Sequence, residues 1–195
     1  MTAIRRALVA AGVLSLALVT GTPAEAVTYP TIPATGTFSF ATANGILPTW
    51  SSENITLVGI SPGSVVTSAA NTTAKVSVPL IAKTGTANAA AGGFRLYNTV
   101  TGASVRCANP TIDTRARVVD CVLADGTNAK LFTIRSIGSR ARVTGVSTIT
   151  TIFRRIQLRI NGTAMADMLN EELDTSSFSP YVTVGTGDLV VTRDR

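Results

Sequence analysis

Apolar residues recur at every second position over much of the chain between residues 37 and 160. Alternation with a period of two is typical of a β-strand that buries one face and exposes the other. Glycine-containing turn sequences, of which Asp125 followed by Gly126 is the clearest, separate these runs. The alternating positions are Phe38 and Phe40, Ile55 and Leu57, Val76, Val78 and Leu80, Phe94 and Leu96, Val105 and Cys107, Val119, Cys121 and Leu123, and Phe132 and Ile134. The pattern predicts a mainly β protein, built as an antiparallel β sandwich or barrel.

The alternation changes parity near residue 152. Val143 and Ile149 are odd-numbered, whereas Ile156 and Leu158, only a few residues later, are even-numbered. A one-residue slip moves every side chain to the opposite face of a strand. A turn or a β-bulge near residue 152 would keep both apolar sets on the same core.

After residue 160 the apolar spacing becomes helical. Asn161 can cap a helix, and the apolar residues that follow recur at intervals of three and four. They are Ala164, Met165, Met168, Leu169 and Leu173. We therefore predict one short C-terminal α-helix, followed by a last strand over residues 188–193. Residues 84–93 are rich in small side chains and are predicted to form a mobile loop.

The N-terminus has the layout of a secretory signal peptide. Arg5 and Arg6 precede an apolar run over residues 7–19, and the small residues Ala24 and Ala26 provide a cleavage site. The apolar run is shorter than the roughly 20 residues that a membrane anchor needs. We predict a signal peptide over residues 1–26, an extended lead-in over 27–36 and a single β domain over 37–195, without a transmembrane segment after cleavage.

The two cysteines support the same compartment. In an exported protein a pair of cysteines is more often a disulfide than a metal site, and the chain has no histidine to complete a metal shell. Cys107 and Cys121 each lie on the apolar face of a predicted strand, so we expect them to form a disulfide. Arginine greatly outnumbers lysine in a chain of net charge +6, which is typical of a GC-rich bacterial genome.

Catalytic signatures are weak. Serine or cysteine nucleophiles lack a histidine base, and the sequence contains no Gly-x-Ser-x-Gly elbow. Asp113, Asp120 and Asp125 lie near the cysteines and could supply two facing carboxylates, as a glycosidase requires. Each also has a structural explanation, as a turn residue or an outward-facing strand residue. The sequence favours a non-enzymatic protein, with a carboxylate-dependent hydrolase as an alternative.

Six arginines alternate with apolar residues and are therefore expected on the solvent faces of strands. Together they form a candidate anion-binding face, although arginine can also serve simply as a soluble surface residue. They are Arg95, Arg106, Arg135, Arg142, Arg155 and Arg159. Nucleic-acid readers usually add aromatic side chains that stack on bases, and only Tyr97 lies near this set.

The C-terminal half resembles the haem-transport-associated (Htaa-type) secreted domains of bacterial surfaces. The resemblance is carried by residues 93–98 with Thr101 and Gly102, residues 108–113 and 123–126, the run over 158–173, Phe178, and residues 185–187. It implies a secreted β-domain. Haem-binding members of that family use a tyrosine with a supporting histidine, so the family pattern assigns no haem ligand in a chain without histidine. Tyr29, Tyr97 and Tyr181 remain candidate haem ligands through tyrosinate alone.

These observations favour a secreted or envelope-associated bacterial module that acts by binding or by structural association. A haem or hydrophobic-ligand binding protein is an alternative. No cofactor is predicted. The candidate partners are an anionic envelope polymer or another envelope protein.

Overall fold

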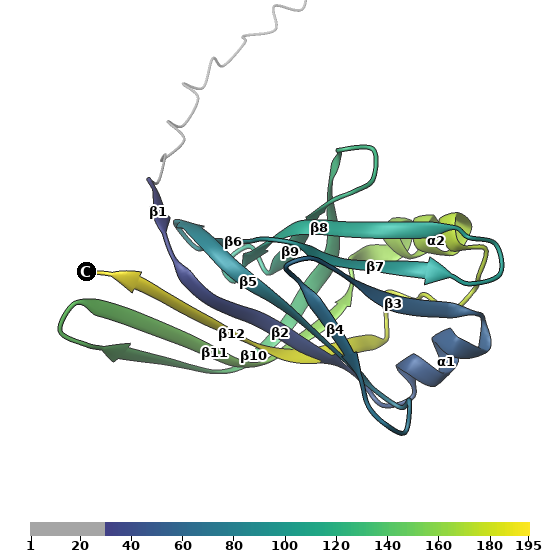
Figure 1. The fold of residues 1–195 in the computed structure, drawn as a ribbon, viewed down its shortest axis with the longest axis horizontal. Helices are drawn as coiled ribbons and strands as arrows, with labels where there is room; N and C mark the ends of the chain where they lie inside the picture. The colour runs from purple at the N-terminus through teal and green to yellow at the C-terminus, as the bar shows by residue number, and fades with distance from the viewer. Residues whose placement is uncertain (1–29) are drawn as a thin grey trace, which may run out of the picture.

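The computed structural model describes residues 30–195, which form a β-barrel with additional strands and two short helices (Figure 1). The predicted signal peptide lies outside the described residues. The strands are β1 (Thr31–Pro33), β2 (Thr35–Thr42), β3 (Ile55–Ile60), β4 (Ser64–Thr67), β5 (Ala74–Thr84), β6 (Ala87–Ala90), β7 (Gly93–Asn98), β8 (Ser104–Asp113), β9 (Val118–Val122), β10 (Asn128–Thr144), β11 (Thr148–Ile160) and β12 (Thr183–Asp194). The helices are α1 (Ile46–Ser52) and α2 (Gly162–Leu173).

Eight antiparallel strands close the barrel. Their order is β5, β2, β12, β11, β10, β9, β8 and β6, and β6 pairs back to β5. β7 and β3 continue the sheet from β8, while β1 and β4 pair with β5. The sequence left a sandwich and a barrel open, and the structure is a barrel. The predicted C-terminal helix is confirmed as α2.

The closing strand β6 lies in the segment that was predicted to be a mobile loop, so that prediction was wrong. Its residues pair with β5 on one side and with β8 on the other. Asn88 is buried there, and its side-chain amide donates hydrogen bonds of 3.1 Å to the carbonyl oxygens of Thr86 and Ile112. Alanine has a low strand propensity, but pairing on both sides overrides it.

Aromatic rings fill the centre of the barrel. The ring centroid of Phe40 lies 5.8 Å from that of Phe94 and 6.0 Å from that of Phe132, and all three side chains are buried. Because the strands that carry these rings are far apart in sequence, the rings join β2, β7 and β10 into one core. The interior of the barrel is therefore packed with side chains rather than open.

The change of parity near residue 152 is explained by a bulge in β11. The register between β11 and β12 shifts between Phe153 and Ile156, and Arg155 has a positive φ of 55°. Phe153 and Ile156 are both buried as a result. The bulge is held by Asp188, whose carboxylate accepts a hydrogen bond of 3.0 Å from the backbone N–H of Arg155.

The disulfide between Cys107 and Cys121 is confirmed. Their Cα atoms lie 4.8 Å apart on the neighbouring strands β8 and β9, and each residue is 1 % exposed. The bridge therefore lies inside the core. A disulfide of this kind is typical of a protein that folds in an oxidising, extracytoplasmic compartment.

Both helices lie at the end of the barrel opposite the long β10–β11 hairpin (Figure 1). Helix α1, which buries Leu47 and Trp50, was not predicted from the sequence. Asn161 is the N-cap residue of α2, as predicted, but its side chain makes no capping hydrogen bond. Its side-chain oxygen instead accepts a hydrogen bond of 2.6 Å from the hydroxyl of Thr133. Within residues 30–195, neither helix has the length and apolar character needed to cross a bilayer.

Two polar side chains form hydrogen bonds that hold the helices in place at this end of the barrel. Glu53, at the end of α1, accepts hydrogen bonds from the hydroxyl of Thr175 and from the backbone N–H of Ser176, beyond α2. Asn98 is buried and donates a hydrogen bond of 2.7 Å to the carbonyl oxygen of Leu173, the last residue of α2. The helices are thus tied to each other and to β7 as well as packed on the core.

Candidate functional site

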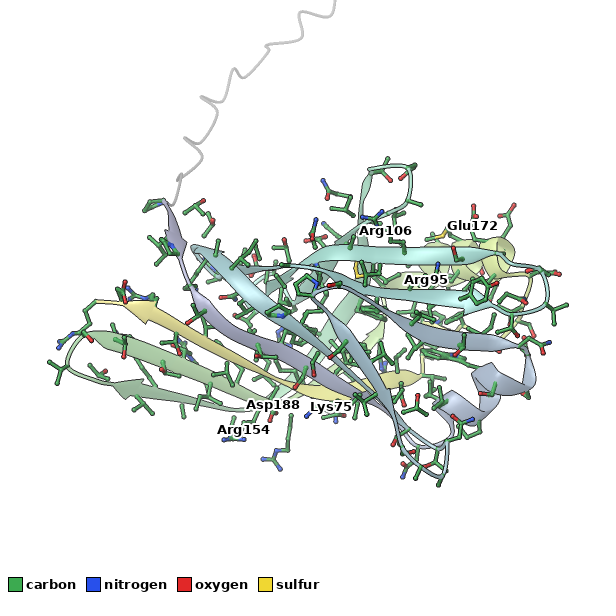
Figure 2. The ribbon with its side chains drawn as sticks, in the orientation of Figure 1. Lys75, Arg95, Arg106, Arg154, Glu172 and Asp188 are labelled. Carbon is green, nitrogen blue, oxygen red and sulfur yellow. A yellow bond between two sulfur atoms is a disulfide. The ribbon has the colours of Figure 1, made fainter. Side chains whose placement is uncertain are left out.

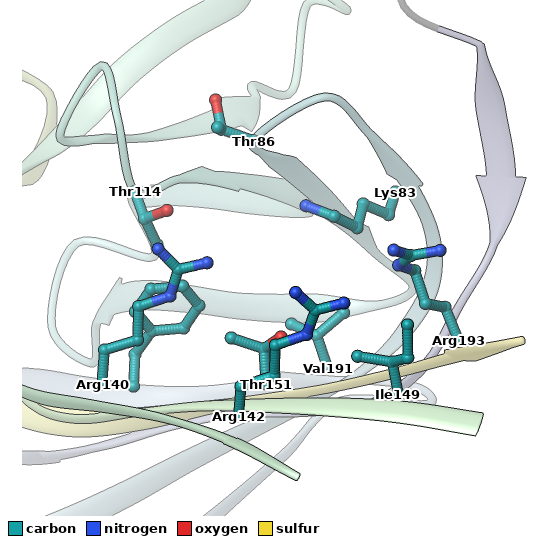
Figure 3. Close-up of a pocket in the computed structure, with 10 residues that line it drawn as sticks. Lys83, Thr86, Thr114, Arg140, Arg142, Ile149, Thr151, Val191 and Arg193 are labelled. Atoms are coloured by element: carbon teal, nitrogen blue, oxygen red, sulfur yellow. The ribbon is translucent and has the colours of Figure 1, made fainter. Parts of the chain in front are cut away.

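The three long strands β10, β11 and β12 continue beyond the barrel at the end away from the helices. The pairing of β9 with β10 ends at Val118 and Thr133, and from there to Thr144 strand β10 pairs with β11 alone. The inner face of this ribbon meets the turn between β5 and β6 and the turn that follows β8. A cavity of about 170 Å³ lies between them (Figure 3).

Four cationic side chains surround this cavity, which we call the basic pocket. They come from three strands: Lys83 from β5, Arg140 and Arg142 from β10, and Arg193 from β12. Figure 3 shows the charged ends of these side chains directed into the same space. The remaining lining residues are three threonines and three apolar residues, namely Thr86, Thr114, Thr151, Ile149, Phe153 and Val191.

Strand register explains why these residues meet. Directly paired residues of an antiparallel sheet point to the same face, and so do residues two positions apart along a strand. The pocket residues of the ribbon form three rows, in which Arg140 is level with Phe153, Arg142 with Thr151 and Val191, and Ile149 with Arg193. The ribbon therefore presents arginines over an apolar floor on one face.

The cations of the basic pocket lack ionic partners in the part of the chain that the structure describes. The one ion pair found there joins Arg154 to Asp188, at 3.5 Å, outside the pocket. Burial lowers the pKa of Lys83 below its ordinary value, and the charges of Arg193 and Arg140 lower it further, while Asp113 acts in the opposite direction. Mutual repulsion among these cations would be relieved by a bound anion.

Most hydrogen-bond donors of these side chains remain available to a ligand. Lys83 donates to the carbonyl oxygen of Gly85, and Arg193 donates to that of Asp194 at 3.2 Å. The guanidinium of Arg140 lies 5.3 Å from the ring centroid of Phe153, a cation–π contact that fixes its position. An arginine carries five N–H donors and a lysine three, so several donors point at the cavity without a protein acceptor.

The six arginines predicted as an anion-binding face lie in several places. Arg142 alone among them lines the basic pocket. Arg95 and Arg106 are paired on β7 and β8, where Figure 2 shows them together.

The other three predicted arginines lie on β10 and β11. Arg135 and Arg159 line a separate cavity beside the start of α2, away from the basic pocket, and Arg155 forms the bulge of β11. Five of the six residues are exposed, and Arg159 is partly buried. Alternation identified surface arginines but not which of them come together.

Sequence reasoning missed Lys83, Arg140 and Arg193. A usable signal was the spacing of Arg140 and Arg142, since two cations two positions apart on a strand share a face. No comparable signal linked them to Lys83 or Arg193, which reach the pocket through the order of strands in the barrel.

The three candidate carboxylates take part in local structure. Burial alone would raise the pKa of Asp113, but hydrogen bonds from the Ala116 N–H, the Thr86 hydroxyl and the Arg115 N–H hold it below its ordinary value. The N–H and hydroxyl of Thr127 lower the pKa of Asp125 in the hairpin turn.

Asp120 is level with Thr111 and Lys130 on the neighbouring strands. Asp125 lines a groove together with Glu172, and neither Asp113 nor Asp120 is among the residues that line it. Lowered pKa values are the opposite of what a general acid needs at neutral pH. The hydrolase stays a prediction that no contact of these side chains supports.

The tyrosines do not converge on a cavity suited to haem. Tyr97 is partly buried, and the guanidinium of Arg95 lies 5.3 Å from its ring centroid. Tyr181 is 77 % exposed, and Tyr29 lies outside the described residues. Within residues 30–195 no three His, Cys, Asp or Glu side chains group as metal ligands.

The sequence matches no protein-family model and no curated protein, and the fold matches no solved structure. The resemblance to Htaa-type domains therefore stays an expectation.

Proposed function

We propose that the protein is a non-enzymatic binding module of the bacterial envelope or cell exterior, and that its ligand is an anion held in the basic pocket. The observation that carries this proposal is the convergence of Lys83, Arg140, Arg142 and Arg193 on one cavity. Within residues 30–195 no carboxylate forms an ion pair with any of them. Clustered like charges cost free energy, and an anionic ligand repays that cost.

The location of the protein is supported by two independent features. The buried disulfide fits folding in an oxidising compartment, and the N-terminal sequence has the layout of a signal peptide. Expression of the full chain in a bacterial host with a secretion system tests this part. We expect the exported product to begin at Val27, and an uncleaved chain in the cytoplasm would contradict it.

Anion binding is tested by isothermal titration calorimetry of the exported protein with tripolyphosphate at low ionic strength. We expect Lys83→Gln and Arg142→Gln each to weaken binding about tenfold, since a charge-assisted hydrogen bond contributes about 1.5–3 kcal/mol and 1.4 kcal/mol corresponds to a factor of ten. Added salt should also weaken binding through screening.

Lys75→Gln is the matched control. Lys75 carries the same charge on the same strand β5, eight residues from Lys83, which is roughly 26 Å at about 3.3 Å per residue. We expect this variant to bind like the parent protein. Absence of binding by the parent, or an equal loss in the Lys75 variant, would contradict a specific anion site in the basic pocket.

A further inference from the structure

We infer that the ligand of the basic pocket is a linear chain of phosphate groups, which lies along a trough rather than in a single anion hole. This inference rests on the proposed function and adds the class of the ligand. It follows from three features of the site: a second cavity that continues the pocket, the spacing of the cations along the ribbon, and the lack of an aromatic surface on which a base could stack.

The basic pocket continues into a second cavity of about 460 Å³. Thr86, Thr114, Arg140 and Phe153 line both cavities, so the two are adjacent. The second cavity adds a fifth cation, Arg115, from the turn between β8 and β9. We call the two cavities together the trough.

The cations follow the length of the trough. Figure 3 shows Lys83 and Arg193 at one side, Arg142 between them and Arg140, and Arg140 at the other side, where the second cavity begins. Arg193 pairs with Ile149, and Ile149 pairs with Thr144. The row of Arg193 therefore lies four positions along β10 from Arg140. At about 3.3 Å per residue these two rows are roughly 13 Å apart. A single phosphate could contact both rows only if both long side chains leaned toward it, whereas a chain of phosphates can contact each row where it stands.

The donors in the trough suit phosphate. Arginine presents a planar fork of N–H groups that matches two phosphate oxygens, and lysine adds a compact positive charge. The threonine hydroxyls that line the cavity can donate further hydrogen bonds to phosphate oxygens. Phosphate groups accept such bonds in every direction, so a flexible chain can engage successive cations.

The trough is poorly suited to a nucleic acid. Proteins that bind single strands without sequence preference stack bases on exposed aromatic side chains. Phe153 is the aromatic residue among those lining the two cavities, and it is 9 % exposed beneath the guanidinium of Arg140. No aromatic face in the described trough is therefore free to stack on a base. The chemistry favours a phosphate chain without bases, either inorganic polyphosphate or a polymer of polyol phosphates.

A length series tests the inference. Orthophosphate, tripolyphosphate, long-chain polyphosphate and a glycerol phosphate oligomer are each titrated into the exported protein at one fixed salt concentration. We expect affinity to rise about tenfold or more from orthophosphate to a chain long enough to reach both rows, because additional phosphates engage further cations. The polyphosphate and glycerol phosphate arms show which of the two sources binds more tightly.

Arg115→Gln separates the trough from the pocket. Arg115 is an exposed turn residue whose backbone N–H, rather than its side chain, bonds to Asp113, so the substitution leaves the turn intact. We expect this variant to bind long chains several-fold more weakly and orthophosphate unchanged. Arg106→Gln, which removes the same charge from the outer face of β8, should change neither affinity.

The outcomes distinguish the two levels of the proposal. Equal affinity for orthophosphate and long chains, with no effect of Arg115→Gln, would overturn the phosphate-chain inference and leave the anion pocket standing. A single-stranded oligonucleotide that binds as tightly as polyphosphate of equal charge would overturn the preference for a chain without bases. Failure of every phosphate compound to bind would overturn both levels.

Discussion

Breaking the disulfide between Cys107 and Cys121 should destabilise the domain without unfolding it at room temperature. The bridge joins two strands that are already neighbours, since Ala108 pairs with Val122 immediately beside it. Strand pairing therefore survives reduction. What is lost is the restriction that the cross-link places on the unfolded chain.

The expected loss follows from the length of the closed loop. The cysteines are separated by 14 positions, and closure of a loop of about 15 residues is worth about 3 kcal/mol in the chain-entropy model. For a domain of this size, each kcal/mol corresponds to roughly 2–4 °C in Tm. Reduction should therefore lower Tm by roughly 6–12 °C.

Urea denaturation of the oxidised protein and of the protein reduced under a strong thiol reagent measures this difference. Reduction keeps both sulfur atoms in the core, so it isolates the cross-link. The double variant Cys107→Ala with Cys121→Ala also removes two buried sulfurs and should be less stable than the reduced parent. A reduced protein within about 0.5 kcal/mol of the oxidised one would refute the loop-entropy reasoning.

Three further substitutions, one of them with a matched control, test other parts of the fold. A Cβ at Gly187 would lie 2.0 Å from a backbone oxygen of β2, so Gly187→Ala should lower the free energy of unfolding, measured by urea denaturation, by about 1–3 kcal/mol. The control Gly145→Ala, at an exposed turn, should change it little. Equal effects of the two substitutions would contradict this packing argument. Asn98→Ala leaves the carbonyl at the end of α2 without its buried donor and should cost about 2–3 kcal/mol; a change within 0.5 kcal/mol would show that water replaces the amide. The hydroxyl of Thr175 is the largest influence that lowers the pKa of Glu53, so the stability from this carboxylate is present above its ordinary pKa and is lost as pH falls through its lowered value. Glu53→Gln should therefore flatten the acid side of a Tm-against-pH profile, and an unchanged profile would remove Glu53 from that role.

Strong local patterns in the sequence predicted much of the fold. Alternating apolar residues identified the long strands, and the change of parity predicted a turn or a bulge near residue 152, where β11 has the bulge at Arg155. The helical stripe identified α2, and the apolar faces of two strands identified the disulfide. In each of these cases the information lies within a few residues of the feature that it predicts.

The rest depends on contacts between distant segments. Strand β6 consists of small residues without alternation, and it is a strand because β5 and β8 supply partners on both sides. The basic pocket likewise exists only after barrel closure brings Lys83 opposite Arg142 and Arg193. Neither strand order nor register can be calculated from local spacing, so the pocket could not be predicted although each of its cations is visible in the sequence.

The shortness of β6 has a consequence for the motions of the barrel. With four residues, it is the shortest of the eight barrel strands, and its side chains are small. Local opening favours short segments with few hydrogen bonds, so we expect the amides of β6 to exchange with solvent faster than those of the other barrel strands where these are paired on both sides. Thr86, immediately before β6, also lines both cavities of the trough. We therefore expect the barrel to open most easily beside the proposed binding site, and a ligand that contacts both β6 and the β10–β12 ribbon should slow this opening.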